Sequence, residues 1–221
     1  AGDRVLDLGA GVGLVSSAIA RIPGVEKVVS IEANLKLVEM IEETHRINSI
    51  DNVELRNGIV AKEAAADVCF YLREHFWSSS MEPDSRPYHE KVLMPAYGIN
   101  DLIEELCPTV IISDIEGGEI DVFEGIDLSG VRTVIIEVHP LVYGLEGQRK
   151  VLKYLDDQGF RAEREYLSGS VWIFNRHPKE EVPRIYTRGP TSPAHNLTNP
   201  RIVIPTCMKN EGPYLLEKTS A

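Results

Sequence analysis

Cysteine is scarce in this sequence, with three residues in a chain of 221. Cys69, Cys107 and Cys207 lie far apart, without the close pairing that a zinc motif or a disulfide framework requires. Their scarcity argues against the small disulfide-stapled folds and is typical of a reducing compartment, so we expect a cytoplasmic location.

Positive charge is also in short supply. The chain has 23 Lys and Arg residues against 34 Asp and Glu residues, which gives a formal net charge of −11. Nucleic-acid binding depends on clustered Lys and Arg, so we expect no nucleic-acid partner.

Long hydrophobic runs are missing as well. No apolar stretch approaches the roughly 18 residues that span a bilayer, so we expect no membrane partner.

What the sequence does contain is a regular alternation of short apolar runs and amphipathic segments. Strands are expected at 4–8, 28–31 and 53–57, with helices at 14–21 and 35–48 between them. This alternation is typical of right-handed βαβ crossovers and predicts an α/β fold with a mostly parallel sheet. Further along we expect two central strands buried on both faces, at 109–113 and 133–138. We also expect a helix at 148–158 and an antiparallel edge hairpin formed by 161–166 and 171–175.

Two segments interrupt the alternation. The polar segment 74–91 is longer than an ordinary connection, and such loops are usually functional or disordered. The proline-rich, polar segment 176–200 is typical of a linker. The predicted organisation is therefore an α/β domain at 1–175, this linker, and the start of another domain at 201–221. Because the chain lacks an initiator Met and stops within a helical pattern, we expect truncation at both ends, with any targeting signal outside it.

The clearest motif is Asp7-Leu-Gly9-Ala-Gly11-Val-Gly13, between an expected strand and an expected helix. Glycines at such a turn let the backbone approach a ligand, and the helix N-terminus offers unpaired N–H groups. A dinucleotide fingerprint would place glycine where this chain has Leu14. The carboxylate of Asp7 would repel a pyrophosphate but suits a cationic cofactor.

Acidic and amide side chains end the next two expected strands. Glu32 follows Gly9 by 23 positions and is placed to accept hydrogen bonds from ribose hydroxyls, as the acidic residue of nucleotide-binding α/β sheets does. Asn57 and Gly58 end the third strand, where an amide and a tight turn would reach an adenine ring. The alternative is a glycine turn that only packs a helix on a strand.

These motifs carry a family resemblance. D-L-G-A-G-V-G followed by I-E-A-N resembles the first two motifs of class I S-adenosylmethionine-dependent methyltransferases. The segment D-I-E-G-G-E-I-D-V-F-E-G at 114–125, I-E-V-H-P at 136–140 and W-S-S-S at 77–80 resemble the FkbM family of O-methyltransferases. The resemblance covers about residues 1–175.

The resemblance implies a Rossmann-like three-layer sandwich that binds S-adenosyl-L-methionine. It also implies O-methylation of a hydroxyl on a saccharide or other small-molecule natural product. Carried onto this chain, the expected cofactor-binding residues are Asp7, Gly9, Ala10, Gly11, Gly13, Glu32, Ala33, Asn34, Asn57, Gly58 and Asp114.

The expected catalytic residues are Glu116, Glu137 and His139, at the carboxyl ends of the two central strands. Asp114 and Glu116 are two apart, as are Glu137 and His139, so each pair would share one side of its strand. His139 is the candidate base, because an unperturbed imidazole has a pKa near 6.5. Glu137 would orient the ring or bind a substrate hydroxyl. The alternative is that His139 only satisfies backbone groups before a proline.

The remaining acidic residues of this region are expected to be solvated. We expect Glu119, Asp121 and Glu124 to be surface charges of a helix, with Glu119 favoured by the helix dipole. The oxygen and nitrogen ligands nearby would also suit a hard cation such as Mg²⁺. No ligand spacing here is diagnostic, so we predict no metal.

The C-terminal segment R-I-V-I-P-T-C-M-K-N-E-G-P-Y-L-L-E at 201–217 resembles the opening of a family 2-like glycosyltransferase domain. That resemblance implies a glycosyltransferase domain in cis in the parent protein, and hence glycan modification. The alternative is an arbitrary strand and a frayed end.

Two other functions stay open from the sequence. One is a non-catalytic cofactor-binding or interaction module of the same fold. The other is an NAD-dependent oxidoreductase, against which Leu14 and Asp7 count.

Overall fold

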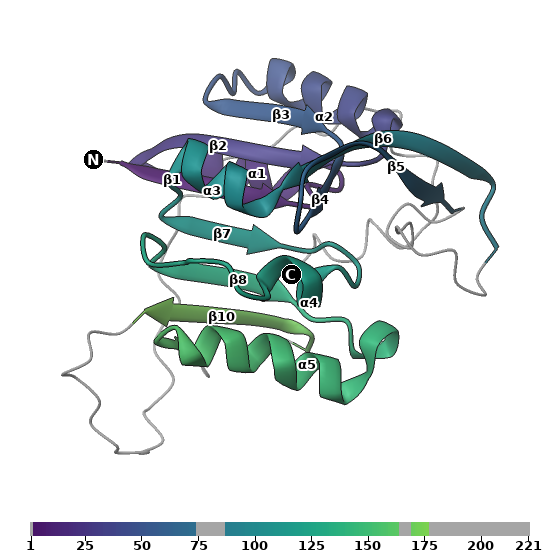
Figure 1. Ribbon diagram of the computed structural model, residues 1–221. Helices are drawn as coiled ribbons and strands as arrows, with labels where there is room; N and C mark the ends of the chain where they lie inside the picture. The colour runs from purple at the N-terminus through teal and green to yellow at the C-terminus, as the bar shows by residue number, and fades with distance from the viewer. Residues whose placement is uncertain (1, 74–86, 164–168, 177–221) are drawn as a thin grey trace.

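A computed structural model of the protein describes residues 2–73, 87–163 and 169–176 (Figure 1). The predicted linker and C-terminal domain, apart from Arg176, lie outside these residues, as does the W-S-S-S segment at 77–80. The described elements are β1 Asp3–Leu8, α1 Leu14–Ala20, β2 Val25–Glu32, α2 Leu35–Ile47, β3 Val53–Asn57, β4 Ile59–Ala61, β5 Ala65–Leu72, β6 Glu90–Gly98, α3 Ile99–Leu106, β7 Val110–Ser113, α4 Glu119–Phe123, β8 Thr133–Glu137, α5 Pro140–Asp157, β9 Phe160–Ala162 and β10 Val171–Arg176.

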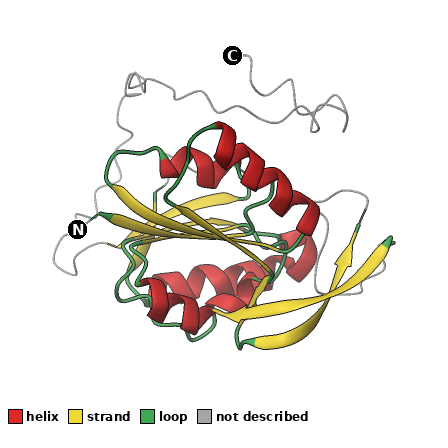
Figure 2. Cartoon of the chain, turned by 90° about the horizontal axis from the view of Figure 1, so that it is seen from above, coloured by secondary structure: helices red, strands yellow, loops and turns green. Residues whose placement is uncertain are grey.

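Seven of the strands form one sheet in the order β3-β2-β1-β7-β8-β10-β9. The first five are parallel to one another, whereas β10 is antiparallel to both β8 and β9. Helices cover both faces of this sheet, which gives three layers (Figure 2). The predicted α/β class, the mostly parallel sheet and the antiparallel edge hairpin are therefore confirmed.

The central strands are buried on both faces because their side chains alternate between two apolar clusters. Leu6 and Ile111 belong to the larger cluster, whereas Val5 and Ile112, their neighbours along the strands, belong to a smaller one. All four residues of β7 are buried. This core holds the carboxyl ends of β1, β2, β3, β7 and β8 along one edge of the sheet.

A second, three-stranded sheet of order β4-β6-β5 was not predicted. It has its own small core, formed by Ile59, Phe70, Leu72, Met94 and Ala96. The first residues of β5, Ala65–Asp67, are exposed, so the strand lacks the alternating pattern that identifies a half-buried strand.

Helix α5 also begins earlier than predicted, at Pro140 rather than near residue 148. Gly144 has a non-helical backbone (φ 72°, ψ 172°) that kinks the element, and the predicted helix corresponds to the part after this kink.

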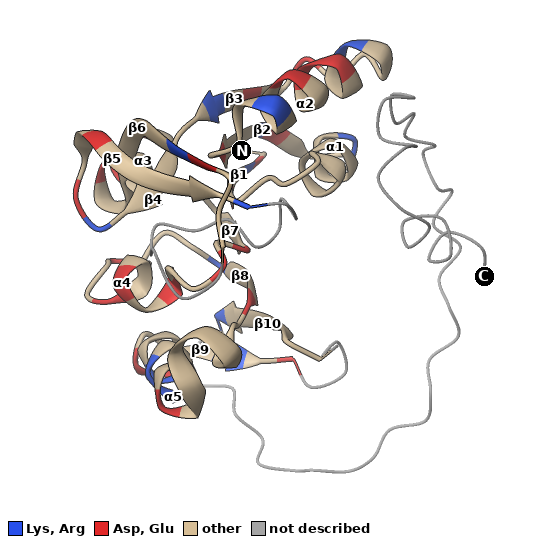
Figure 3. Cartoon of the chain, turned by 90° about the vertical axis from the view of Figure 1, so that its right-hand side faces the viewer, with Lys and Arg blue, Asp and Glu red and all other residues tan. Residues whose placement is uncertain are grey.

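Charged residues are spread over several helices, with both signs on α2 and α5 and acidic residues on α4 (Figure 3). Within residues 2–73, 87–163 and 169–176, none of the helices combines the length and apolar character that a membrane span requires.

Candidate active site

The loop between β1 and α1 contains three glycines with positive φ, and they have different roles. A Cβ at Gly9 would lie 1.9 Å from the carbonyl oxygen of Asp114, so glycine there lets β1 and the chain after β7 pack together. A Cβ at Gly13 would lie 2.8 Å from Ile41 of α2. Only at Gly11 would a Cβ meet open space. Gly11 is therefore the glycine of this loop whose backbone a ligand can approach.

Glu32, the last residue of β2, joins two loops. Its Oε2 accepts a hydrogen bond from the Gly11 N–H at 2.7 Å, and its Oε1 accepts one from the Asn34 N–H at 2.7 Å. The side chain is buried, and burial raises the pKa of Glu32 to about 7 although both amides favour the charged form. A buried carboxylate at this position is suited to accept hydrogen bonds from ligand hydroxyls.

This raised pKa predicts a pH-dependent stability. The folded chain retains a proton on Glu32 that the unfolded chain loses above the ordinary pKa of 4.5, so stability falls as pH rises from about 4.5 to 7. The contribution is up to about 3 kcal/mol. Urea unfolding at pH 5 and pH 8 should therefore show a smaller difference for Glu32→Gln than for the wild type.

The matched control is Glu39→Gln, which changes an exposed residue of α2 and should leave this pH difference unchanged. Equal pH differences in the wild type and Glu32→Gln would contradict the assignment. The comparison isolates Glu32 because Asp7, whose burial raises its pKa to about 6, contributes in the same direction in both proteins.

The other residues predicted to contact the cofactor at the ends of β2 and β3 hold the loop after β2. Nδ2 of Asn57 donates to the carbonyl oxygens of Glu32 and Ala33, at 2.9 and 3.1 Å, and the Gly58 N–H donates to Glu32 at 3.0 Å. Asn34 caps α2 by accepting a hydrogen bond from the Lys36 N–H. Their contact with a cofactor stays a prediction, whereas their part in shaping the loop is visible.

Asp7 and Ala10 are buried in this region. The side chain of Asp7 accepts a hydrogen bond from the Ser30 hydroxyl at 3.1 Å, across the pair of strands β1 and β2. The Gly9 and Ala10 N–H groups both donate to the carbonyl oxygen of Ile31. Asp7 thus lies in the sheet beneath the glycine loop. A ligand would contact the backbone of the loop, and not the side chain of Asp7 directly.

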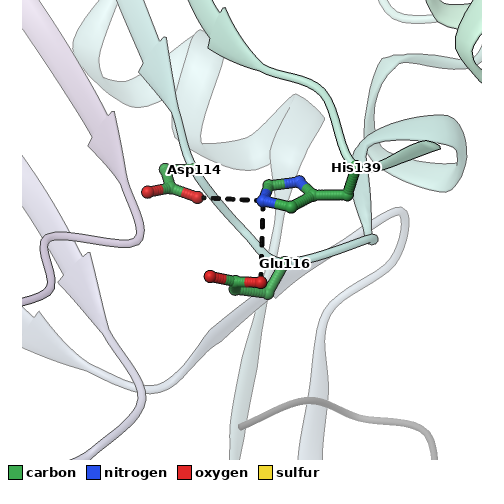
Figure 4. A group of neighbouring side chains, drawn as sticks. All are labelled: Asp114, Glu116 and His139. Carbon is green, nitrogen blue, oxygen red and sulfur yellow. Dashed lines mark ion pairs between the residues drawn. The ribbon is translucent and has the colours of Figure 1, made fainter. Parts of the chain in front are cut away.

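A second group of polar side chains lies at the ends of β7 and β8. Nε2 of His139 is 3.5 Å from Oδ1 of Asp114 and 3.6 Å from Oε2 of Glu116 (Figure 4). The predicted proximity of these residues is confirmed, but Asp114 and Glu116 do not share one side of a strand as predicted. Strand β7 ends at Ser113, and the left-handed backbone of Glu116 (φ 55°) turns its side chain toward His139.

Glu119 was predicted to be a surface charge, and this prediction was wrong. It is 0% exposed, and its Oε1 is 2.8 Å from Nδ1 of His139. Glu119 precedes the buried residues Val122 and Phe123 by three and four positions. Residues at this spacing share one helix face, so the sequence did contain a signal that Glu119 points inward. Asp121 and Glu124 are exposed, as predicted.

The charge state of His139 also differs from the expectation based on its ordinary pKa. Burial alone would lower the pKa of His139, but the hydrogen bond with Glu119 and the carboxylates of Glu116 and Asp114 outweigh burial and raise it to about 9. Without a ligand, the imidazole therefore carries a proton near pH 7. Desolvation and neighbouring carboxylates raise the pKa of Asp114 to about 6 and that of Glu116 to about 7, although His139 opposes both shifts.

Glu137 does not orient the imidazole, contrary to one of its two predicted roles. Its Oε1 accepts a hydrogen bond from the Ser170 hydroxyl at 2.6 Å, and Glu119 takes the orienting position. The backbone N–H of His139 donates to the Tyr143 hydroxyl at 2.6 Å. Because the imidazole bonds to Glu119, the alternative that this side chain only satisfies backbone groups is also wrong.

The parallel sheet, the glycine loop after β1 and the acidic residue ending β2 define the Rossmann-like class of cofactor-binding domains. Within that class, the model of the methyltransferase FkbM domain matches residues 7–162, and the chain belongs to this family. Membership of a methyltransferase family counts against the oxidoreductase alternative.

A solved structure of the same family has a similar fold. The methyltransferase FkbM of Methylobacillus flagellatus KT matches with a TM-score of 0.50 and 16% identity, over 78% of this chain and 43% of that one. The precorrin-6y C5,15-methyltransferase of Geobacter metallireducens GS-15 matches with a TM-score of 0.45 and 15% identity, over 80% and 81%. This chain thus spans less than half of the FkbM structure. A sequence search of curated proteins returns no match.

Proposed function

We propose that the protein is an S-adenosyl-L-methionine-dependent O-methyltransferase acting on a hydroxyl of a saccharide or other natural product. The observation that carries this proposal is the meeting of two sites at one sheet edge. Gly11 and Glu32 present an approachable backbone and a buried carboxylate, and Asp114, Glu116 and His139 form a cluster at the neighbouring strand ends. Membership of a methyltransferase family supports the same reaction type.

The residues after β1 and β2 fit the chemistry of this cofactor. The open space at Gly11 admits a ligand close to the backbone, and Glu32 lies where ribose hydroxyls would donate hydrogen bonds. S-adenosylmethionine supplies an electrophilic methyl group on a positively charged sulfur when bound. The backbone of Asp114 packs against Gly9, which places Asp114 beside the glycine loop. Its carboxylate would favour the positive charge on sulfur.

The second cluster fits the acceptor side of the reaction. In methyl transfer the acceptor oxygen bonds to the methyl carbon, the carbon–sulfur bond breaks, and its electron pair stays on sulfur. The hydroxyl proton must leave, and the carboxylates of Asp114 and Glu116 supply groups that take it up, whereas the imidazole of His139 beside them helps to orient the hydroxyl. Glu119 fixes the orientation of the imidazole through its hydrogen bond with Nδ1.

The nature of the acceptor is proposed from the sequence. The resemblance of 201–217 to the start of a glycosyltransferase domain supports a saccharide acceptor and a glycosyltransferase domain in cis in the parent protein. Few cysteines support a cytoplasmic setting.

A transfer assay tests the proposed function. The protein is incubated with S-adenosylmethionine labelled in the methyl group and with a panel of mono- and oligosaccharides, and the products are analysed for labelled methyl ethers. We expect label in an ether linkage on at least one acceptor. Cofactor binding without transfer to any hydroxyl would instead favour the non-catalytic binding module.

A further inference from the structure

Three potential metal ligands converge on one point at the ends of β7 and β8. Asp114, Glu116 and His139 each offer one ligand atom, and these three atoms lie within 4.8 Å of one another (Figure 4). In octahedral coordination, metal–ligand bonds of about 2.0–2.2 Å place neighbouring ligand atoms roughly 2.8–3.1 Å apart. The distances from Nε2 of His139 to the two carboxylate oxygens, 3.5 and 3.6 Å, are somewhat longer, so the two carboxylates would move slightly toward a bound cation.

The surroundings of His139 provide independent support. Ligating histidines usually donate their second ring N–H to a carboxylate, which fixes the tautomer and directs the other nitrogen at the metal. Glu119 accepts such a bond at Nδ1, which leaves Nε2 facing Asp114 and Glu116. Glu119 is completely buried, and its Oε2 has no hydrogen-bond partner among the described residues.

The charge balance of the cluster points the same way. Asp114, Glu116 and Glu119 bring three carboxylates to one imidazole. In the part of the chain that the structure describes, no lysine or arginine forms an ion pair with any of the three. Even a protonated imidazole would leave an excess of negative charge in a partly desolvated place, and a divalent cation would neutralise it.

We infer that Asp114, Glu116 and His139 form a binding site for a divalent cation of the Mg²⁺ and Mn²⁺ class. Two carboxylate oxygens favour such hard cations, and the imidazole nitrogen favours Mn²⁺ within the class. The sequence alone indicated no metal, because the ligands come from two strand ends and their spacing matches no known motif.

A cation here would also serve the proposed reaction, and this part of the inference rests on the proposed function. Three protein ligands leave coordination positions open, and an acceptor hydroxyl oxygen in one of them would lose its proton more easily. His139 would then act as a ligand through Nε2.

The test is a titration of the full chain with MnCl₂ in the absence of cofactor, followed by electron paramagnetic resonance of free Mn²⁺. We expect one Mn²⁺ per chain, with at least about tenfold weaker binding in Asp114→Asn and in Glu116→Gln. Asp121→Asn is the matched control, because Asp121 is an exposed acidic residue of α4 outside the cluster. It should bind Mn²⁺ as the wild type does.

Equal Mn²⁺ affinity in the wild type and the Asp114→Asn/Glu116→Gln double variant would overturn the site, as would equal weakening in Asp121→Asn. Thermal unfolding followed by circular dichroism shows whether each variant folds, and Asp114→Asn is informative because Asp114 is exposed. A parallel titration with S-adenosylhomocysteine separates the two proposals. Binding of Mn²⁺ without binding of S-adenosylhomocysteine would support the metal site and contradict the methyltransferase proposal. Binding of S-adenosylhomocysteine without binding of Mn²⁺ would support the methyltransferase proposal and contradict the metal site.

Discussion

Replacing His139 by alanine is expected to lower kcat by about 10²-fold or more, with the affinity for S-adenosylhomocysteine unchanged. The imidazole faces Asp114 and Glu116 at the acceptor end of the site, whereas Glu32 and Gly11 form the cofactor end. Removing it eliminates either a group that orients the hydroxyl or a metal ligand, and both losses affect the reaction rather than cofactor binding. Steady-state kinetics on an acceptor found in the transfer assay, with calorimetry of S-adenosylhomocysteine, measure the two effects.

The matched control is His89→Ala, which removes an exposed histidine beside the three-stranded sheet and should leave kcat unchanged. Unchanged kcat in His139→Ala would remove this residue from the mechanism. A parallel loss of cofactor affinity would contradict the division of the site into cofactor and acceptor ends.

Gly9→Ala is expected to destabilise the protein by at least about 3 kcal/mol. The new Cβ would lie 1.9 Å from the Asp114 carbonyl oxygen, and a backbone atom cannot move aside as a flexible side chain would. The left-handed backbone of Gly9 (φ 83°) adds strain for any L-residue. Urea unfolding followed by circular dichroism measures the loss.

Gly11→Ala is the control for this prediction, because it shares a positive φ but its Cβ would meet open space. It should cost only about 1 kcal/mol of stability while weakening cofactor binding. Equal destabilisation by the two substitutions would show that backbone strain, and not the contact between Gly9 and Asp114, decides the effect.

The fold was largely predictable because its signals are local. Apolar runs separated by amphipathic segments identify βαβ units, and the two central strands are mostly apolar because helices cover both faces of the sheet. The three-stranded sheet was missed because it is stabilised by a small core that includes Ile59, Phe70 and Met94, residues distant in the sequence.

The candidate site was predictable in position but not in its contacts. The carboxyl ends of parallel strands meet at one edge, so the proximity of Asp114, Glu116 and His139 follows from topology. The role of Glu119 depends on which way a five-residue helix turns its face, and the pKa of His139 depends on three carboxylates that only the tertiary structure assembles. Similarly, Asn57 meets the Glu32 carbonyl only through the pairing of β2 with β3.

The most direct test of the proposed function is calorimetric titration of the full chain with S-adenosylhomocysteine and NAD⁺ in parallel. We predict binding of S-adenosylhomocysteine with a Kd on the order of micromolar and no binding of NAD⁺, since Leu14 replaces the fingerprint glycine and Asp7 precedes the loop. Binding of NAD⁺, or no binding of S-adenosylhomocysteine, would contradict the assignment of the Gly11 and Glu32 site to this cofactor.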